Sequence, residues 1–423
     1  MNHQEHPEAG ETVDTAEDKL KIALCLSGGG YRAALFHLGA LRRMNELGIL
    51  GRVDTLSSVS GGSILSAHLA ACLKKQPFQG GKIPDWENLV AVPFRKFCSR
   101  DIRTIPIFKR FLLPWNWPNR STQVNALMSR YRRYLTDMKL VDLPEHPNFV
   151  FCATDIVFGI NWVFERTRVG DYGIRHIKTP ADWTVARAVA ASSCFPPIFD
   201  PMPIGKHFVK ESKRQKLDIG KKEGLLPKIR LSDGGVYDNL GLEPTKKHNV
   251  IFVSDGGAPF KIFEEGTAFR LWMRYFGIAS NQVGALRKRW LFADFNTKVV
   301  TDDGVGPLKQ GGYWGVLNAS TDHDDSALPG YDESLAEDII SQIRTDLDGF
   351  TKGEIAVLEN HGYLLANRII RKYLPQFYPD PAPALDVPHP EWMDYVQIRC
   401  MLRDSHSRFS WRRIWNKIIR RKS

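Results

Sequence analysis

The sequence predicts a three-layer α/β fold in which helices cover a mainly parallel sheet. Two strand–turn–helix units predict it. The apolar run 21–26 leads through three glycines into a helical pattern over 33–44, and the run 53–59 leads through a serine and two glycines into another over 64–73. Two later apolar segments both end in Asp-Gly-Gly, which places further polar residues at strand ends.

We predict one catalytic domain with a segment on either side. Residues 1–19 are polar and acidic, which predicts a disordered tail. The catalytic domain takes up 20–375, with the motifs in 20–260 and a helical cover in 261–375. Residues 376–423 form a C-terminal extension that ends in a basic amphipathic helix. The chain has 423 residues, 43% of them apolar, which is enough for a full globular core.

Gly28, Gly29 and Gly30 form a tight turn between the first strand and the first helix. Their N–H groups would point over the helix N-terminus, where the dipole favours negative charge, so the turn predicts a cradle for an anion. That anion is either a phosphate or an oxyanion formed during a reaction. No Lys-Ser or Lys-Thr follows to make a P-loop, but a loose G-x-G-x-x-A match with Asp54 downstream leaves a dinucleotide site open. A turn that merely needs small residues is the third interpretation.

Ser60 stands at a sharp strand-to-helix turn, which is the layout of a nucleophile elbow. In an elbow the strained turn exposes the serine Oγ, and small neighbours let the helix begin without a collision. The usual pattern is G-x-S-x-G, whereas this chain has Ser58 in place of the first glycine. The alternative interpretation is that Ser60 only caps the following helix.

A serine hydroxyl needs a base that takes its proton, and Asp233 is the stronger candidate. None of the 12 histidines has an obvious catalytic setting, and we assign His37 and His361 to packing within helices. Asp233 precedes two glycines that allow another backbone to approach closely. Asp255 has the same Asp-Gly-Gly pattern, and spacing alone does not rank the two.

Four segments in this order resemble the patatin-like phospholipases, a family related to the catalytic domain of cytosolic phospholipase A2. They are the glycine turn with its basic residue, the elbow, a small-residue segment with prolines and aromatics, and Asp-Gly-Gly with a trailing asparagine (28–32, 58–62, 190–199 and 233–239). The resemblance extends over about 20–260 and returns in 343–363. It implies a patatin-like fold in which the base comes first, so that Asp255 is a structural copy.

The resemblance also implies a serine acyl-ester hydrolase, most often a phospholipase A or lysophospholipase. Asp233 would accept the Ser60 proton directly, and Ser60 would attack the ester carbonyl to form an acyl-enzyme. The oxyanion would be held by backbone N–H groups, each worth about 3 kcal/mol in the barrier, from Gly28, Gly29, Gly30 and Gly61.

Arg32 follows the glycine turn and would add positive charge or orient the turn. The alternatives are that it faces solvent on the helix or pairs with a carboxylate. No cofactor is expected, and no metal either, because no His/Cys/Asp cluster has zinc spacing.

The net charge of +11 rises to near +16 once the acidic tail is set aside, and it is concentrated in three segments: 94–133, 206–230 and 407–423. The second is interpreted as an exposed loop insertion. The third predicts a basic amphipathic helix for an anionic interface, or one that packs on the protein body, from the helical spacing of Trp411, Ile414, Trp415, Ile418 and Ile419. Trp115 and Trp117, between prolines, predict a membrane-touching lid or a hydrophobic cover.

The expected partner is an anionic phospholipid membrane, and a regulatory partner or ligand is left unidentified. Nucleic acid is not expected, because no zinc finger, RNP or helix-turn-helix pattern accompanies the basic segments. Six scattered cysteines suit a reducing cytosol, and no apolar run has the 18 or more residues of a transmembrane helix. We therefore expect a cytoplasmic protein with peripheral membrane association.

Two other functions remain open at this point. One is an esterase or thioesterase that acts on soluble acyl compounds. The other is a lipid-binding, membrane-docking protein that keeps the fold without turnover, against which the presence of both Ser60 and Asp233 argues.

Overall fold

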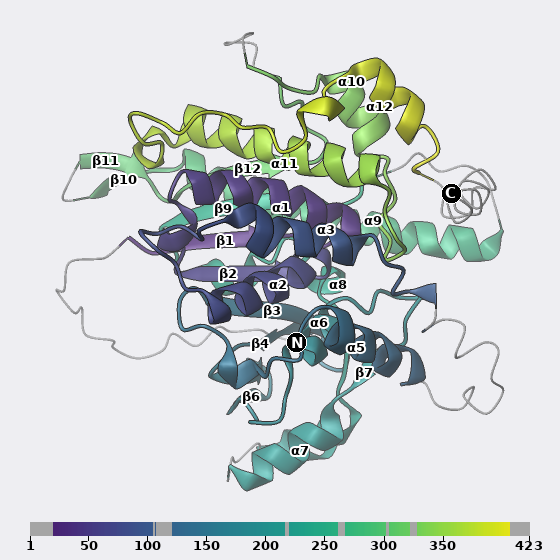
Figure 1. The fold of residues 1–423 in the computed structure, drawn as a ribbon. Helices are drawn as coiled ribbons and strands as arrows, with labels where there is room; N and C mark the ends of the chain where they lie inside the picture. Colours follow the sequence, from purple (N-terminus) through teal and green to yellow (C-terminus); the bar gives the residue numbers. More distant parts are fainter. Residues whose placement is uncertain are drawn as a thin grey trace.

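A mixed sheet with helices on both of its faces forms the middle of the molecule (Figure 1). The computed structural model describes residues 20–104, 106, 121–215, 220–260, 267–301, 304–321 and 328–406. Within these residues the sheet has ten strands, in the order β12-β9-β1-β2-β3-β4-β5-β6, with β8 paired to β3 and β7 paired to β8. The prediction of a three-layer α/β fold is confirmed.

The strands from β12 to β3 run parallel to one another, and those beyond β3 are antiparallel. A separate antiparallel hairpin is made by β10 and β11. In chain order the strands are β1 (Ile22–Leu26), β2 (Thr55–Val59), β3 (Asn148–Asp155), β4 (Ile160–Phe164), β5 (Arg168–Asp171), β6 (Arg175–Lys178), β7 (Met202–Pro203), β8 (Arg230–Asp233), β9 (Val250–Asp255), β10 (Lys298–Thr301), β11 (Gly304–Pro307) and β12 (Gln310–Gly315).

The helices predicted over 33–44 and 64–73 are present as α1 and α2, and the helix to which His361 was assigned is present as α11. The α-helices are α1 (Gly30–Glu46), α2 (Gly61–Lys75), α3 (Val92–Cys98), α5 (Thr122–Tyr134), α6 (Val185–Ser192), α7 (Gly205–Arg214), α8 (Gly235–Asp238), α9 (Ala268–Asn296), α10 (Glu333–Leu335), α11 (Lys352–Tyr373) and α12 (Tyr395–Leu402). Short 3₁₀ or π turns lie between them at Leu50–Arg52, Glu87–Ala91, Leu140–Asp142, Gly220–Lys228, Glu243–Thr245, Ala336–Ile340, Pro375–Phe377 and Pro390–Trp392.

Helices α1 and α11 lie side by side and touch through two glycines (Figure 1). A Cβ placed on Gly39 would lie 1.8 Å from the carbonyl oxygen of Glu359, and a Cβ on Gly362 would lie 1.8 Å from that of Phe36. The two backbones are therefore in direct contact. This crossing joins a helix from the last quarter of the chain to the first strand–turn–helix unit.

Two predictions about the later segments are wrong. The segment 261–375 is not only a helical cover, because its strand β12 extends the parallel sheet beyond β9. The segment 206–230 is not an exposed loop at its start, since α7 buries Phe208 against Trp162, with ring centroids 5.3 Å apart. Both errors arise from long-range packing that local composition does not reveal.

Several predictions lie outside the described residues. They concern the acidic tail 1–19, the tryptophan pair Trp115 and Trp117, and the basic helix in 407–423. Among the described helices, none combines the length and the hydropathy that crossing a bilayer requires.

The glycine crossing predicts a large effect of one methyl group. Gly39→Ala or Gly362→Ala should lower the free energy of unfolding by about 2–4 kcal/mol, because the helices must separate to admit the Cβ. Gly284→Ala on α9 is the control, since no atom lies within 4 Å of its added Cβ and alanine favours a helix by about 0.5–1 kcal/mol over glycine. Urea denaturation measures all three. Equal small effects at the three glycines would contradict the crossing.

Candidate active site

Strands β2 and β8 meet end to end along one edge of β3. β2 runs parallel to β3 and ends at Val59, which is paired with Cys152. β8 runs antiparallel to β3 and ends at Asp233, which is paired with Ala153. Because β4 occupies the opposite edge of β3 at these positions, β2 and β8 share one edge. Ser60, the residue after β2, therefore lies beside the end of β8.

The backbone of Ser60 is in a conformation that serine rarely adopts, with φ 49° and ψ −110°. Its side chain makes no capping hydrogen bond to α2, so the structure does not support the interpretation of Ser60 as a cap. The glycines after it pack closely on the first turn. A Cβ on Gly61 would lie 2.2 Å from the carbonyl oxygen of Gly30, and one on Gly62 would lie 2.3 Å from that of Leu26. This is the strained, tightly packed geometry of an elbow.

A chain of serine hydroxyls holds the elbow in place. The N–H of Ser60 donates to Ser192 Oγ at 2.9 Å, and Ser192 Oγ lies 2.9 Å from Ser63 Oγ. Ser63 donates to Ser58 Oγ, which in turn donates to the Val150 carbonyl on β3, both at 3.2 Å. Ser58, the departure from the usual elbow pattern, is therefore an anchor between the elbow and the sheet.

The C-terminal end of α6 binds the strand that carries Asp233 as well. Gly234 N–H donates to the Ser192 carbonyl at 3.2 Å, and Asp233 N–H donates to the Cys194 carbonyl at 3.4 Å. A Cβ on Gly234 would lie 2.5 Å from the Cys152 carbonyl, which is the close approach predicted for the Asp-Gly-Gly glycines. Ser192 was missed by sequence reasoning, although the segment 190–199 was singled out by the resemblance.

Asp233 is almost fully buried, and only one of its two carboxylate oxygens accepts a hydrogen bond from the described residues. Its Oδ1 accepts the Gly235 N–H at 2.7 Å, while Oδ2 has no hydrogen-bond partner among the described residues. Burial raises the pKa of Asp233 to about 7, and the Gly235 N–H and the Ser60 hydroxyl act in the opposite direction. No hydrogen bond of ordinary geometry joins Ser60 Oγ to Asp233 among these residues. Oδ2 is the oxygen left to accept one, and a pKa near 7 suits a general base.

Asp255 has no such free oxygen. Its Oδ2 accepts hydrogen bonds from Tyr313 at 2.7 Å and from Lys288 at 3.1 Å, and its Oδ1 accepts the Gly257 N–H at 2.9 Å. Burial acts to raise the pKa of Asp255, but the charge of Lys288 and these hydrogen bonds outweigh it and lower the pKa. The geometry therefore ranks the two Asp-Gly-Gly segments, with Asp233 as the candidate base.

The glycine turn differs from prediction at one position. The Gly28 N–H already donates to the Asn239 carbonyl at 3.0 Å, so it is not available to an oxyanion. Gly28 is instead needed for space, since a Cβ there would lie 2.4 Å from Asn239 Oδ1. Within the described residues the N–H groups of Gly29, Gly30 and Gly61 have no hydrogen-bond acceptor.

A family model described as patatin-like phospholipase matches residues 24–246, which is more than half of the chain. The chain belongs to the patatin-like phospholipase family. The matched region contains the glycine turn, the elbow and Asp233. No curated protein has a sequence that matches this chain.

The solved structures with some likeness to this patatin-like phospholipase are distant. Human GIVD cytosolic phospholipase A2 has 13% identity and a TM-score of 0.43, over 85% of this chain and 61% of that chain. Its complex with methyl gamma-linolenyl fluorophosphonate has 13% identity and a TM-score of 0.44, over 85% and 59%. VipD from Legionella pneumophila has 13% identity and a TM-score of 0.34, over 84% and 67%. The chain thus spans about three fifths of the phospholipase A2 structures, and its family rests on the sequence match.

Arg32 of this patatin-like domain binds backbone carbonyls. It is 1% exposed, and its guanidinium donates to the Gly256 carbonyl at 2.9 and 3.2 Å and to the carbonyls of Ser341 and Ile343. Burial lowers its pKa to about 10, so it stays charged near neutral pH. Both alternatives, a solvent-facing side chain and a carboxylate partner, are wrong. The Gly256 carbonyl also lies against Gly29, so Arg32 is connected to the turn through this carbonyl.

The two histidines singled out in the sequence are structural. His37 Nε2 lies 3.0 Å from the Ser27 carbonyl, which also accepts the Gly62 N–H, and His37 Nδ1 lies 2.7 Å from Ser254 Oγ. Burial lowers the pKa of His37, and that of His361, to about 4, so both rings are neutral. His37 thereby joins the glycine turn to the elbow without touching Asp233.

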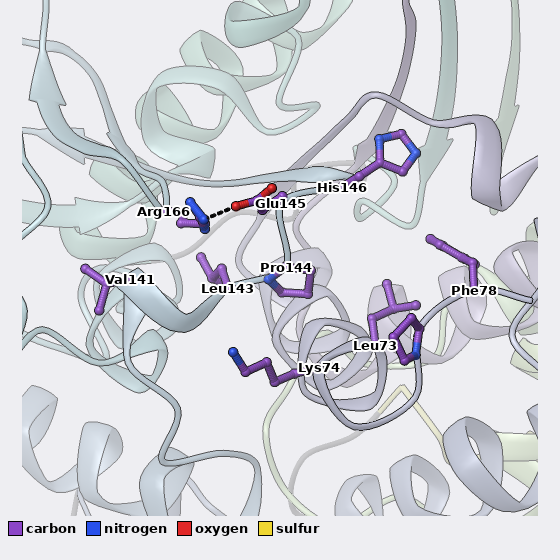
Figure 2. Close-up of a pocket in the computed structure, with 10 residues that line it drawn as sticks. Leu73, Lys74, Phe78, Val141, Leu143, Pro144, Glu145, His146 and Arg166 are labelled. Atoms are coloured by element: carbon purple, nitrogen blue, oxygen red, sulfur yellow. Dashed lines mark hydrogen bonds and ion pairs between the residues drawn. The ribbon is translucent and has the colours of Figure 1, made fainter.

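One cavity of this patatin-like domain lies away from Ser60. It has a volume of about 390 Å³ and lies beside Leu73 and Lys74, at the C-terminal end of α2, with the Arg166–Glu145 ion pair along it (Figure 2). Ser60 precedes the opposite end of α2 and is itself 9% exposed. Among the described residues no group of three or more His, Cys, Asp or Glu side chains has the arrangement of a metal site.

Asp233 gives a test that does not depend on activity. An aspartate whose pKa is about 7 when folded, against an ordinary value of 3.8, contributes stability that is lost as the pH rises between those values. Asp233→Asn removes that titration, so it should raise the free energy of unfolding more at about pH 8 than at about pH 5, by up to about 3 kcal/mol. Chemical denaturation at the two pH values measures this, and an equal change at both would contradict the raised pKa.

Proposed function

We propose that the protein hydrolyses acyl esters of membrane phospholipids with a Ser60–Asp233 dyad, as a phospholipase A or lysophospholipase. Family membership supports lipid acyl hydrolysis in general. The observation that carries the dyad is the meeting of two strand ends, which brings a strained serine to a buried carboxylate with one oxygen free. A buried oxygen without a partner is costly to a fold, so its presence here favours a chemical role.

The dyad would act in two balanced steps. Asp233 Oδ2 accepts the Ser60 proton while Ser60 Oγ attacks the ester carbonyl carbon, and the proton then leaves with the alcohol product as the acyl-enzyme forms. In the second step Asp233 takes a proton from water, the water oxygen attacks the acyl carbon, and the proton returns to Ser60 Oγ as the fatty acid departs. No metal or cofactor is required by either step.

The oxyanion of both steps would be stabilised by backbone donors of two different turns. Gly29 and Gly30 belong to the first turn and Gly61 to the elbow, and the contact of Gly61 with the Gly30 carbonyl keeps the turns together. Such preorganised donors need no rearrangement as charge develops on the oxygen. Arg32 would contribute by holding the Gly256 carbonyl against Gly29, and is a positioning residue in this proposal.

The dyad predicts loss of activity from two single changes. Ser60→Ala and Asp233→Asn should each reduce fatty acid release from phospholipid vesicles by about 10³-fold or more, since nucleophile and base act as a unit. Ser66→Ala is the matched control on α2, because the Ser66 hydroxyl has no partner in the described residues and lies outside the dyad. Mass spectrometry of the released lipids measures the effect.

Different results would change the assignment. Hydrolysis at the wild-type rate by either Ser60→Ala or Asp233→Asn would contradict the dyad assignment. Turnover of soluble acyl esters or thioesters with none of phospholipids would favour the esterase alternative. Lipid binding without any turnover by wild-type protein would favour the non-catalytic alternative.

The pKa of Asp233 predicts the pH profile of the same reaction. Only the ionised carboxylate accepts the Ser60 proton, so kcat/KM should rise with pH to a plateau with a midpoint of about 7. Below the midpoint it should fall about tenfold per pH unit. The pH profile is best measured with a short-chain soluble ester, because its hydrolysis depends on the dyad and does not require membrane binding. A midpoint near the ordinary aspartate value would refute the assignment.

A further inference from the structure

Helix α9 carries apolar side chains along one face that remain substantially exposed to solvent. Six of them are exposed by between 39% and 63%, and we call them the α9 stripe: Leu271, Tyr275, Ile278, Val283, Leu286 and Trp290. At 100° per residue these positions fall within an arc of about 140° on one side of the helix. Such a stripe is the arrangement of a helix that packs against something apolar.

Contacts on the opposite side of α9 determine the direction in which the stripe points. Arg287 pairs with Asp238 at 3.4 Å and with Glu243 at 3.1 Å, and Leu291 is buried in a cluster with residues of β1 and β9. Lys288 pairs with Asp255 at 3.1 Å. These contacts hold one side of α9 against the body, so the α9 stripe is turned away from the protein.

The middle of α9 lacks the buried apolar side chains that normally stabilise a helix. No residue from 274 to 290 is buried, although the segment contains two glycines that disfavour a helix. Most helical stability in proteins comes from tertiary packing of an apolar face. A long exposed apolar face is also uncommon on a monomer and marks an interaction site. The α9 stripe therefore calls for a partner.

The composition of the helix indicates a lipid surface as that partner. Tyr275 and Trp290, each 63% exposed, are the most exposed members of the stripe, and these aromatic residues are favoured where a bilayer meets water. Residues 271–290 contain four basic residues and no acidic one. Arg287 and Lys288 are paired with carboxylates of the body, but Arg289 is exposed and, at 100° per residue, lies within the arc of the stripe. Its charge is attracted to anionic lipids and disfavours a second copy of the same helix. We propose that the α9 stripe docks on the surface of a bilayer that contains anionic phospholipid.

Docking through this surface would bring the candidate site to its substrate. Arg287 binds Asp238 in α8, the helix that begins two residues after Asp233, and Lys288 binds Asp255 at the end of β9. Helix α9 is therefore attached to the strand ends where Ser60 and Asp233 lie, and it runs beside α8 (Figure 1). The purpose of docking rests on the proposed hydrolysis, but docking itself is measured without it.

The test is binding of the full chain to vesicles of neutral lipid, with and without anionic phosphatidylglycerol. The double variant Tyr275→Ser/Trp290→Ser should bind the anionic vesicles at least about tenfold more weakly than wild type, since both anchors of the stripe are lost. The matched control is Tyr373→Ser/Val396→Ser, which removes two equally exposed apolar side chains, 61% and 79%, from α11 and α12. It should bind as wild type does. Arg289→Gln should weaken binding to the anionic vesicles alone.

Other outcomes would overturn the proposal. They are absence of wild-type binding, equal binding by the stripe variant, or equal loss in the control. If wild type forms a dimer that the stripe variant loses, the stripe is an interface between two copies instead. Hydrolysis of a soluble ester separates the two proposals. If both proposals hold, the stripe variant should still hydrolyse the soluble ester while its hydrolysis of vesicles falls. If the proposed hydrolysis is wrong, wild type should hydrolyse neither substrate but should still bind the vesicles.

Discussion

The shared edge of β3 is the constraint on which the candidate site depends. Two strands that approach from opposite directions occupy that edge in succession, and the gap between their ends sets the distance from Ser60 to Asp233. The placement is made by main-chain hydrogen bonds of a sheet, so it does not require the two side chains to attract each other. The strand that carries Asp233, a carboxylate with a raised pKa, is held next to Ser60 by its pairing with β3.

The surroundings of the elbow maintain a strained backbone. A positive φ at a serine costs roughly 1–3 kcal/mol and persists only where neighbouring contacts determine it. Here the contacts come from Ser192 on one side and from the backbones of Gly30 and Leu26 on the other. Another main chain lies where a side chain would be at Gly29, Gly30, Gly61 and Gly62, and the Asn239 side chain lies there at Gly28. This explains why small residues are gathered at this point.

Local sequence patterns were sufficient to predict the strands and helices near the site. They were insufficient to predict which distant residues contact one another there. The strands and helices next to Ser60 follow from apolar periodicity, and Asp233 follows from a strand end with two glycines. The Gly28 N–H is taken up by the carbonyl of Asn239, which accepts its hydrogen bond from more than two hundred residues away, and nothing near Gly28 in the sequence indicates this. The same holds for the carbonyls bound by Arg32, for Ser192 at the Ser60 N–H and for β12 in the sheet. The order in which distant segments pair was the missing information.

The guanidinium of Arg32 links the first turn to carbonyls of Ser341 and Ile343. The next turn residue, Gly30, lies against the backbone of Asp346. A growing chain that has reached residue 260 therefore has every motif residue but lacks part of the frame around the glycine turn. During synthesis the frame around the glycine turn is therefore completed only after residues 341–346 have emerged and packed against it. The order of translation thus separates the making of the motif residues from the making of their support.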